Sequence, residues 1–235
     1  MIQFYSPEIR NDSSLGGEES SHCTRVLRKR IGDIIYVTDG RGMRYECRIT
    51  DASSRCVRVE IINETLIPRN WNFKLTLAVA PTKNADRMAW LVEKATEIGV
   101  NEISFIDCKF GERKKVNLER LRRNALSAMN QSLKTWLPDI TEMKPLDSIL
   151  LKEGEKFFGY CNNEMQRLSF VTEYNPNSDV VIAIGPEGDF SHEEVEKLVT
   201  SGFKAVTFGD ERLRTETAAL YAVTSVHVVN TLRLK

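Results

Sequence analysis

The chain has 235 residues, 41% of them hydrophobic and 28% charged, a composition typical of folded proteins that excludes a disordered or fibrous chain. Its 33 Lys and Arg balance 33 Asp and Glu, so net charge excludes no class of partner and only local clusters are informative. The 5 cysteines form no C-x-x-C pair and the 3 histidines lie far apart, which predicts a reduced, cytoplasmic protein with no metal site. No apolar run has the length of a membrane span, and no secretory signal is expected.

Residues 1–70 are predicted to form a small β domain. Its expected strands are Ile34–Thr38, Tyr45–Thr50 and Cys56–Ile62. Turn-forming residues separate them at 39–42 and 51–54, and short strands at this spacing predict a compact barrel or sandwich. The segment 63–72 contains Pro68 and breaks the β pattern, so we expect it to be the linker to a second domain.

A basic cluster precedes these strands. Arg25, Arg28, Lys29 and Arg30 lie close together after His22, and Val26 and Leu27 could anchor a short helix. Such a cluster could contact RNA phosphates. It could equally be a solvated surface turn, and the pattern alone leaves both interpretations open.

From Phe73 onward, predicted strands alternate with predicted helices. The expected strands are Leu75–Ala80, Ile103–Ile106, Phe157–Tyr160, Val180–Ile184 and Ala205–Phe208. Asn84 or Asp86 begins an amphipathic helix that Gly99 ends, a second helix covers Leu118–Leu133, and a third begins at a capping box of Ser191 and Glu194. The last helix is expected to start near Thr215. This alternation predicts a mostly parallel α/β sheet over residues 73–235.

Two strand-to-helix loops are candidates for a ligand site. The first, Gly185–Gly188, follows an apolar strand, and its glycines would let the backbone approach a ligand closely. The second, 208–218, is polar and contains Gly209, Arg212 and Arg214. No G-x-G-x-x-G or P-loop pattern is present, so nicotinamide and P-loop nucleotide sites are not indicated. Taken alone, either loop could be an ordinary turn between a strand and a helix.

A third candidate is a run of cations. Arg113, Lys114 and Lys115 are followed by Arg120, Arg122 and Arg123, which modestly favours a nucleic-acid partner. A solvated basic helix face would have the same composition. Carboxylates such as Glu187 and Asp189 could take part in acid–base chemistry, but their spacing specifies no reaction.

These features, in this order, resemble the ribosomal RNA small-subunit methyltransferase E family of the SPOUT superfamily along essentially the whole chain. The resemblance rests on His22-x-x-Arg-Val-Leu-Arg28, Glu93–Val100, Glu112-Arg113, Gln131-Ser132, Ile184–Gly188 and Leu213–Ala218. It implies an N-terminal PUA-like β-barrel that binds RNA, and a C-terminal α/β methyltransferase domain with a trefoil knot. It also implies a homodimer that transfers a methyl group from S-adenosylmethionine to N3 of a uridine in 16S rRNA of the small ribosomal subunit.

The resemblance further implies roles for individual residues. The expected cofactor-binding residues are Tyr160, Ile184, Gly185, Pro186, Glu187, Gly188, Phe208, Gly209, Leu213, Thr215 and Thr217. The expected RNA-binding residues are His22, Arg25, Arg28, Lys29, Arg30, Arg113 and Lys114. Arg25 and Arg214 are the expected catalytic arginines, with Arg113 next, and Glu216 is a candidate general base that could instead be structural.

The sequence departs from the family pattern at two positions. Asp189 follows Gly188 where the family usually has a second glycine, and Asn130 stands where a glutamate commonly precedes Gln-Ser. Because the cofactor motifs specify the methyl donor better than the acceptor, the alternatives are a SPOUT methyltransferase for another RNA and a non-catalytic RNA-binding assembly factor. A small-molecule α/β enzyme is a third alternative, which the paired basic clusters disfavour.

Overall fold

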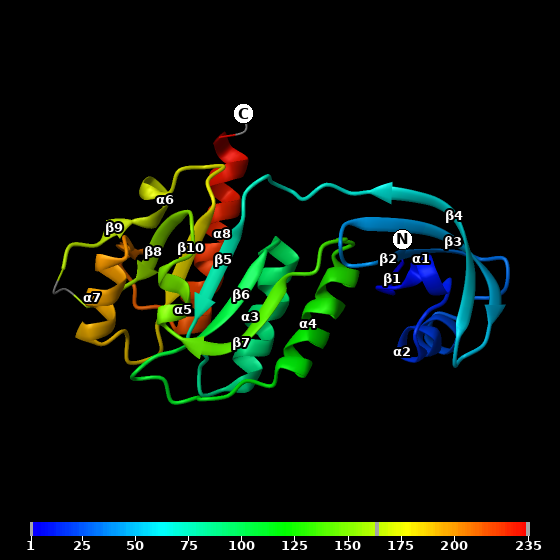
Figure 1. Cartoon of the computed structure of the whole chain (residues 1–235), viewed down its shortest axis with the longest axis horizontal. Helices are drawn as coiled ribbons and strands as arrows, with labels where there is room; N and C mark the ends of the chain where they lie inside the picture. The colour runs from blue at the N-terminus through cyan, green and yellow to red at the C-terminus, as the bar shows by residue number, and fades with distance from the viewer. Residues whose placement is uncertain (1, 163–164, 234–235) are drawn as a thin grey trace. The chain divides into compact units, whose positions relative to one another are not determined.

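The computed structural model describes residues 2–162 and 165–233 (Figure 1). By its internal contacts, the chain divides into two compact units. The first comprises the chain up to Asn70 together with Leu126–Leu137, and the second comprises Trp71–Ala125 and the chain from Pro138 onward. Each unit has its own sheet.

The first unit is built on a small mixed sheet in the order β1-β2-β3-β4. The strands are β1 (Gln3–Tyr5), β2 (Ile34–Thr38), β3 (Met43–Ala52) and β4 (Val57–Leu66). β1 pairs parallel with β2, and the remaining pairs are antiparallel. One prediction was wrong here, since Asn63–Leu66 is not linker but the second half of β4, paired with Met43–Glu46 of β3. Its backbone groups are satisfied by this ladder, which the polar sequence of the segment does not reveal.

Short helices precede β2 in the same unit. They are α1 (Ile9–Asp12), α2 (Gly17–Ser21) and a π-helical turn η1 (His22–Val26). Ser20 connects them to the sheet, because its hydroxyl oxygen accepts the Val57 N–H at 2.8 Å while the hydroxyl donates to the Leu15 carbonyl at 3.0 Å. The predicted helix at Val26 is therefore only the end of a helical segment that starts at Gly17.

The second unit contains a sheet in the order β7-β6-β5-β10-β8-β11-β9. Its strands are β5 (Leu75–Val79), β6 (Glu102–Asp107), β7 (Asp139–Pro145), β8 (Glu155–Gly159), β9 (Leu168–Ser169), β10 (Val180–Ile184) and β11 (Lys204–Thr207). Every pair within it is parallel, which confirms the predicted α/β class. The sequence did not predict β7 and β9, because the first is a largely polar edge strand and the second has only 2 residues.

The second unit also contains the helices α3 (Ala85–Ile98), α5 (Asp147–Leu150), α6 (Phe170–Glu173), α7 (His192–Thr200) and α8 (Thr215–Arg233) (Figure 1). α4 (Leu118–Gln131) is divided between the two units, since Leu126–Leu137 belongs to the first. The Asn84 side chain caps α3 at the Asp86 N–H, and Ser191 and Glu194 form the predicted capping box of α7. α8 packs on α3, β5 and β10, while Leu198 of α7 is buried with Val181 and Ala183 of β10. The central strand β10 is fully buried, as its apolar sequence predicts.

A buried carboxylate at the start of β6 makes the stability of this unit dependent on pH. Burial alone would raise the pKa of Glu102, but hydrogen bonds from Lys152, Lys74 and Ser104 outweigh it and hold the pKa at about 2. Both lysine ammonium groups lie 2.7 Å from its carboxylate oxygens. Because the folded pKa lies below the usual 4.5, the stabilisation is complete above pH 4.5 and is lost as the pH falls toward 2.

Replacement of Glu102 by glutamine is therefore expected to lower the free energy of unfolding by roughly 3 kcal/mol at pH 7 and by much less near pH 2. Urea unfolding at both pH values measures this difference. The control is Glu142→Gln, which changes an exposed side chain on β7. Equal losses for Glu102→Gln at both pH values would show that the ion cluster contributes nothing to the pH dependence.

In the part of the chain that the structure describes, no helix combines the length and apolarity needed to cross a membrane. Passage of the chain through a trefoil knot, which the resemblance implies, stays a prediction.

Candidate functional site

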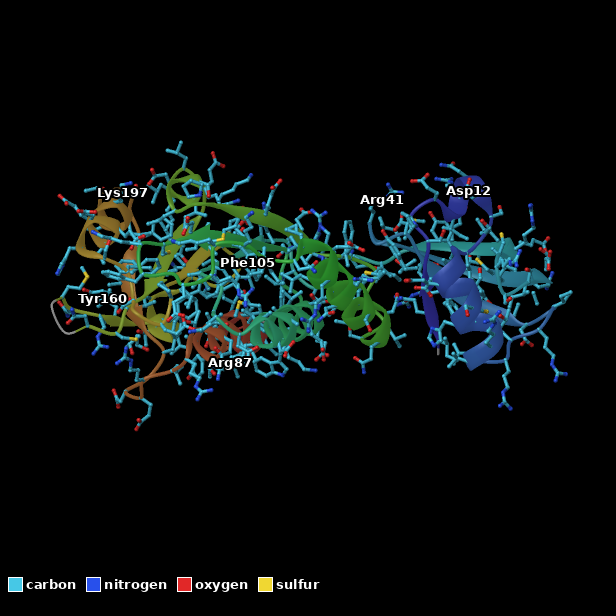
Figure 2. The ribbon with its side chains drawn as sticks, turned by 90° about the horizontal axis from the view of Figure 1, so that it is seen from below. Asp12, Arg41, Arg87, Phe105, Tyr160 and Lys197 are labelled. Atoms are coloured by element: carbon cyan, nitrogen blue, oxygen red, sulfur yellow. The ribbon has the colours of Figure 1, made fainter. Side chains whose placement is uncertain are left out.

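The carboxyl ends of three neighbouring strands, β10, β8 and β11, open onto a single pocket. Because the three strands are parallel, the loops that follow them leave the same edge of the sheet. These loops enclose a cavity of about 800 Å³ lined by Gly159–Asn162, Ile184–Glu187 and Val206–Thr215, with Arg167, Asp189 and Ala218 completing it. Tyr160, at the end of β8, is labelled in Figure 2.

Most of the expected cofactor residues meet in this cavity. The lining includes Tyr160, Ile184, Gly185, Pro186, Glu187, Phe208, Gly209, Leu213 and Thr215. Two expected residues do not line it. Gly188 lines a smaller neighbouring hollow instead, and Thr217 is exposed on α8. The structure thus brings together both loops that the sequence singled out and the loop after Phe157–Tyr160, which was expected from the resemblance to complete the pocket.

A buried hydrogen bond connects the two loops that the sequence singled out. The Thr215 hydroxyl donates to the Gly185 carbonyl at 3.1 Å, and both residues are buried. The Arg212 guanidinium donates to the Glu187 carbonyl at 3.5 Å, which is a weak contact. Because the first bond is buried, we infer that Thr215 fixes the position of the second loop relative to the end of β10.

The pocket wall carries charges of both signs. The lining includes Arg167, Arg212 and Arg214 and also Glu187, Asp189, Asp210 and Glu211. Arg214 is exposed, and within residues 2–162 and 165–233 no ion pair or side-chain hydrogen bond engages its guanidinium. Cys161 is exposed as a residue, but partial desolvation of its thiol, together with the nearby Asp189 carboxylate, raises the pKa of that thiol.

Two of the three expected catalytic residues do not line the pocket. Arg25 belongs to the first unit, where its guanidinium donates to the Ser54 hydroxyl at 3.3 Å. Glu216 is buried in the first turn of α8, with one carboxylate oxygen 3.4 Å from Nε of Arg87. Its other oxygen is buried without a hydrogen-bond partner in the described residues. Arg214 is the expected catalytic residue that does line the pocket.

The expected RNA-binding cations differ in how far their side chains are already engaged. Arg113 donates to the carbonyls of Thr82 and Lys83, and Lys114 pairs with Asp107 at 2.7 Å. In the first unit, His22, Arg25, Arg28 and Arg30 are exposed and Lys29 is half-buried. His22, Arg28 and Arg30 are therefore exposed at a surface, Arg25 is exposed but donates to Ser54, and Arg113 holds the segment before α3.

Several pocket residues were not predicted from the sequence. Cys161 and Asn162 follow β8, Arg167 precedes β9, and Asp210 and Glu211 lie in the loop after β11. No motif surrounds the first three. The only sequence signal was positional, since a loop that follows a buried parallel strand opens at the ligand-binding edge. In the same described ranges, no group of His, Cys, Asp and Glu side chains could hold a metal ion.

Comparison with known proteins agrees with this architecture. Residues 69–227 match a family described as an RNA methyltransferase domain, and residues 15–62 match an RNA methyltransferase PUA domain. The ribosomal RNA small subunit methyltransferase E of Rickettsia conorii is 28% identical over 87% of this chain and 84% of its own length.

Two solved structures are similar over nearly the whole chain. A probable rRNA-methyltransferase from Porphyromonas gingivalis has a TM-score of 0.94 and 36% identity, covering 99% of this chain and 100% of that one. The ribosomal RNA small subunit methyltransferase E from Neisseria gonorrhoeae, bound to S-adenosylmethionine, has a TM-score of 0.84 and 26% identity over 97% and 98% of the two chains. From the matched domains, the shared fold and the pocket at the end of β10, we conclude that this chain belongs to the ribosomal RNA small subunit methyltransferase E family.

Proposed function

We propose that the protein transfers a methyl group from S-adenosylmethionine to N3 of a specific uridine in 16S rRNA of the small ribosomal subunit. S-adenosylmethionine-dependent RNA methylation follows from the family, and the uridine and its N3 atom are the specific part of the proposal. The observation that carries it is the pocket at the ends of β8, β10 and β11, which has an exposed arginine, Arg214, in its wall.

The residues of the pocket fit this cofactor. A cavity of about 800 Å³ lies within the range of roughly 300–1,000 Å³ that is usual for small-molecule sites. We propose that the apolar side chains of Ile184 and Leu213 hold the adenine ring, whose edge hydrogen-bonds with neighbouring backbone groups. Carboxylates such as Glu187 suit the ribose hydroxyls, and Arg212 suits the carboxylate of the methionine part. All these residues line one cavity.

When bound, S-adenosylmethionine supplies an electrophilic methyl group attached to a good leaving group. The acceptor is the harder part of the reaction, because N3 of uracil carries a proton and lies on the base-pairing edge, which must be exposed before transfer. As the N3–methyl bond forms, the bond from the methyl group to sulfur breaks and releases S-adenosylhomocysteine, while the N3 proton passes to water. We propose that Arg214 holds the base in line and stabilises the negative charge that develops on it. Its guanidinium is suited to this role because it is exposed at the pocket wall and unpaired in the described structure.

RNA contact is a further part of the proposal. The domain of residues 1–70 would bind RNA phosphates through Arg25, Arg28 and Arg30, which are exposed.

We also propose that the protein is a homodimer. This is supported by exposed apolar side chains along α8, namely Tyr221, Val228 and Leu232. A stable, fully active monomer in sedimentation would contradict the dimer.

The acceptor can be tested by competition between RNAs. Purified protein and labelled S-adenosylmethionine are incubated with small subunits that lack the modification, with free 16S rRNA, or with tRNA. We expect label in 16S rRNA, released on digestion as N3-methyluridine. Preferential labelling of tRNA would favour another RNA target within the superfamily. Cofactor binding without transfer to any RNA would favour a non-catalytic assembly factor.

A further inference from the structure

Asp189, at the end of the loop that follows β10, makes three hydrogen bonds of different kinds. Its N–H donates to the Pro186 carbonyl at 3.0 Å and closes a turn. One carboxylate oxygen accepts the N–H of Phe190 at 2.9 Å. The other accepts the N–H of Cys161, also at 2.9 Å. The last bond joins two segments that are 28 residues apart in the chain.

The backbone of Asp189 adopts a conformation that a side chain disfavours. Its φ is 65°, in the left-handed region, where glycine is favoured and Asp and Asn are tolerated best among other residues. Ser13, Arg28, Leu133 and Asn177 share this property in the described chain, but none of them lines the pocket. The three hydrogen bonds hold Asp189 in this conformation and aim its carboxylate at the loop after β8.

That loop and the loop after β10 are two walls of the cofactor pocket. The N–H of Tyr160 donates to the Val206 carbonyl at 3.1 Å, so the end of β8 is fixed to β11. One residue further on, the Cys161 N–H is fixed by Asp189 instead. Asp189, Tyr160 and Asn162 also line a second hollow of about 320 Å³. Asp189 therefore stands in the wall that the pocket and the hollow share.

We propose that Asp189 is a positioning residue: its carboxylate joins the loops after β8 and β10 and so sets the shape of the pocket that receives the methyl donor. The inference rests on the proposed function of that pocket. Asp189 acts through the backbone of Cys161 and Phe190 and takes no part in the transfer itself.

Two substitutions test this link between the two loops, which we call the Asp189 bridge. Asp189→Gly removes both side-chain hydrogen bonds, to Cys161 and to Phe190, but allows a φ of 65° without strain, so any loss reflects the missing carboxylate and not backbone strain. Asp189→Asn tolerates the same backbone conformation and keeps an oxygen that can accept one of the two N–H groups. The matched control is Asn177→Gly, since Asn177 has a φ of 63°, is exposed and lies outside the pocket.

Calorimetric titration with S-adenosylmethionine is the primary readout. We expect the Kd to rise about 10-fold for Asp189→Gly and about 3-fold for Asp189→Asn, with no change for the control. In steady-state assays the KM for S-adenosylmethionine should rise by the same factors, while kcat at saturating cofactor changes by less than about 3-fold. Thermal unfolding of the free protein should show that both variants are folded at the assay temperature.

An unchanged Kd in both Asp189 variants would overturn the inference and leave the proposed function intact. A loss of affinity fully explained by a smaller folded fraction would also overturn it. Failure of the unmodified protein to bind S-adenosylmethionine would instead refute the proposed function, and the inference with it.

Discussion

Replacement of Arg214 by alanine is expected to lower kcat for methyl transfer by about 100- to 1,000-fold, while the Kd for S-adenosylmethionine changes by less than about 3-fold. The reason is that the guanidinium lines the pocket, is exposed and is unpaired in the described structure, so it is free to meet charge that develops on the acceptor base. Single-turnover methylation of unmodified small subunits measures the rate, and calorimetry measures the affinity.

Two further variants sharpen the interpretation of this result. Arg214→Lys keeps the positive charge but not the planar guanidinium, so it should recover only part of the rate. Arg48→Ala removes an arginine paired with Glu60 on the surface of the first unit and should leave turnover unchanged. If Arg214→Ala stays folded but loses cofactor binding, the arginine holds the methyl donor and the catalytic role proposed for it is wrong.

Replacement of Arg87 by alanine is expected to lower the free energy of unfolding by about 2–3 kcal/mol. Figure 2 shows Arg87 beside α8, where it pairs with Glu216 at 3.4 Å. Glu216 is 6% exposed, so loss of the arginine leaves a buried carboxylate without a counter-ion. The effect stays below that of a fully buried pair because the Arg87 side chain is 36% exposed. Urea unfolding at pH 7 measures it.

Variants of the Arg87–Glu216 ion pair also test whether Glu216 is structural or catalytic. The stability control is Arg120→Ala, whose pair with Asp86 is exposed on both sides and should contribute less than about 1 kcal/mol. In the double variant Arg87→Met, Glu216→Leu, the uncompensated charge is removed, so we expect most of the stability to return. Turnover should then stay within about 3-fold of the original, because Glu216 does not line the pocket. A folded double variant without turnover would restore Glu216 as a catalytic candidate.

Patterns of apolar residues predicted the parts of the fold that are buried. β10 is apolar throughout and buried throughout, α7 is capped at Ser191 as predicted, and of the two candidates for the cap of α3 the structure selects Asn84. The predictions failed for strands that are held by pairing with another strand and not by burial of their own side chains. Asn63–Leu66 is polar, yet it forms a strand because it pairs with Met43–Glu46 of β3. β7 was missed because it lies at the edge of the sheet, where only Ile140 is buried and the other positions can be polar.

Sequence motifs located the pocket better than they assigned individual roles. The motifs around Gly185 and Leu213 converge because their strands are parallel, a consequence of topology that holds for any sequence of this class. The bridge from Asp189 to Cys161 could not be predicted, since it depends on the loop after β8 reaching the loop after β10. Likewise, nothing around Glu216 in the sequence indicates that its partner is Arg87, more than a hundred residues earlier in the chain.

A crystal structure of the protein with S-adenosylmethionine tests the central claim most directly. We predict that the cofactor lies between Ile184–Gly185 and Phe208–Leu213, next to Tyr160, with its methyl group facing Arg214. Cofactor density in any other place, such as the smaller hollow beside Phe110, would contradict this account of the site. So would the absence of binding at saturating cofactor concentrations when the protein is folded.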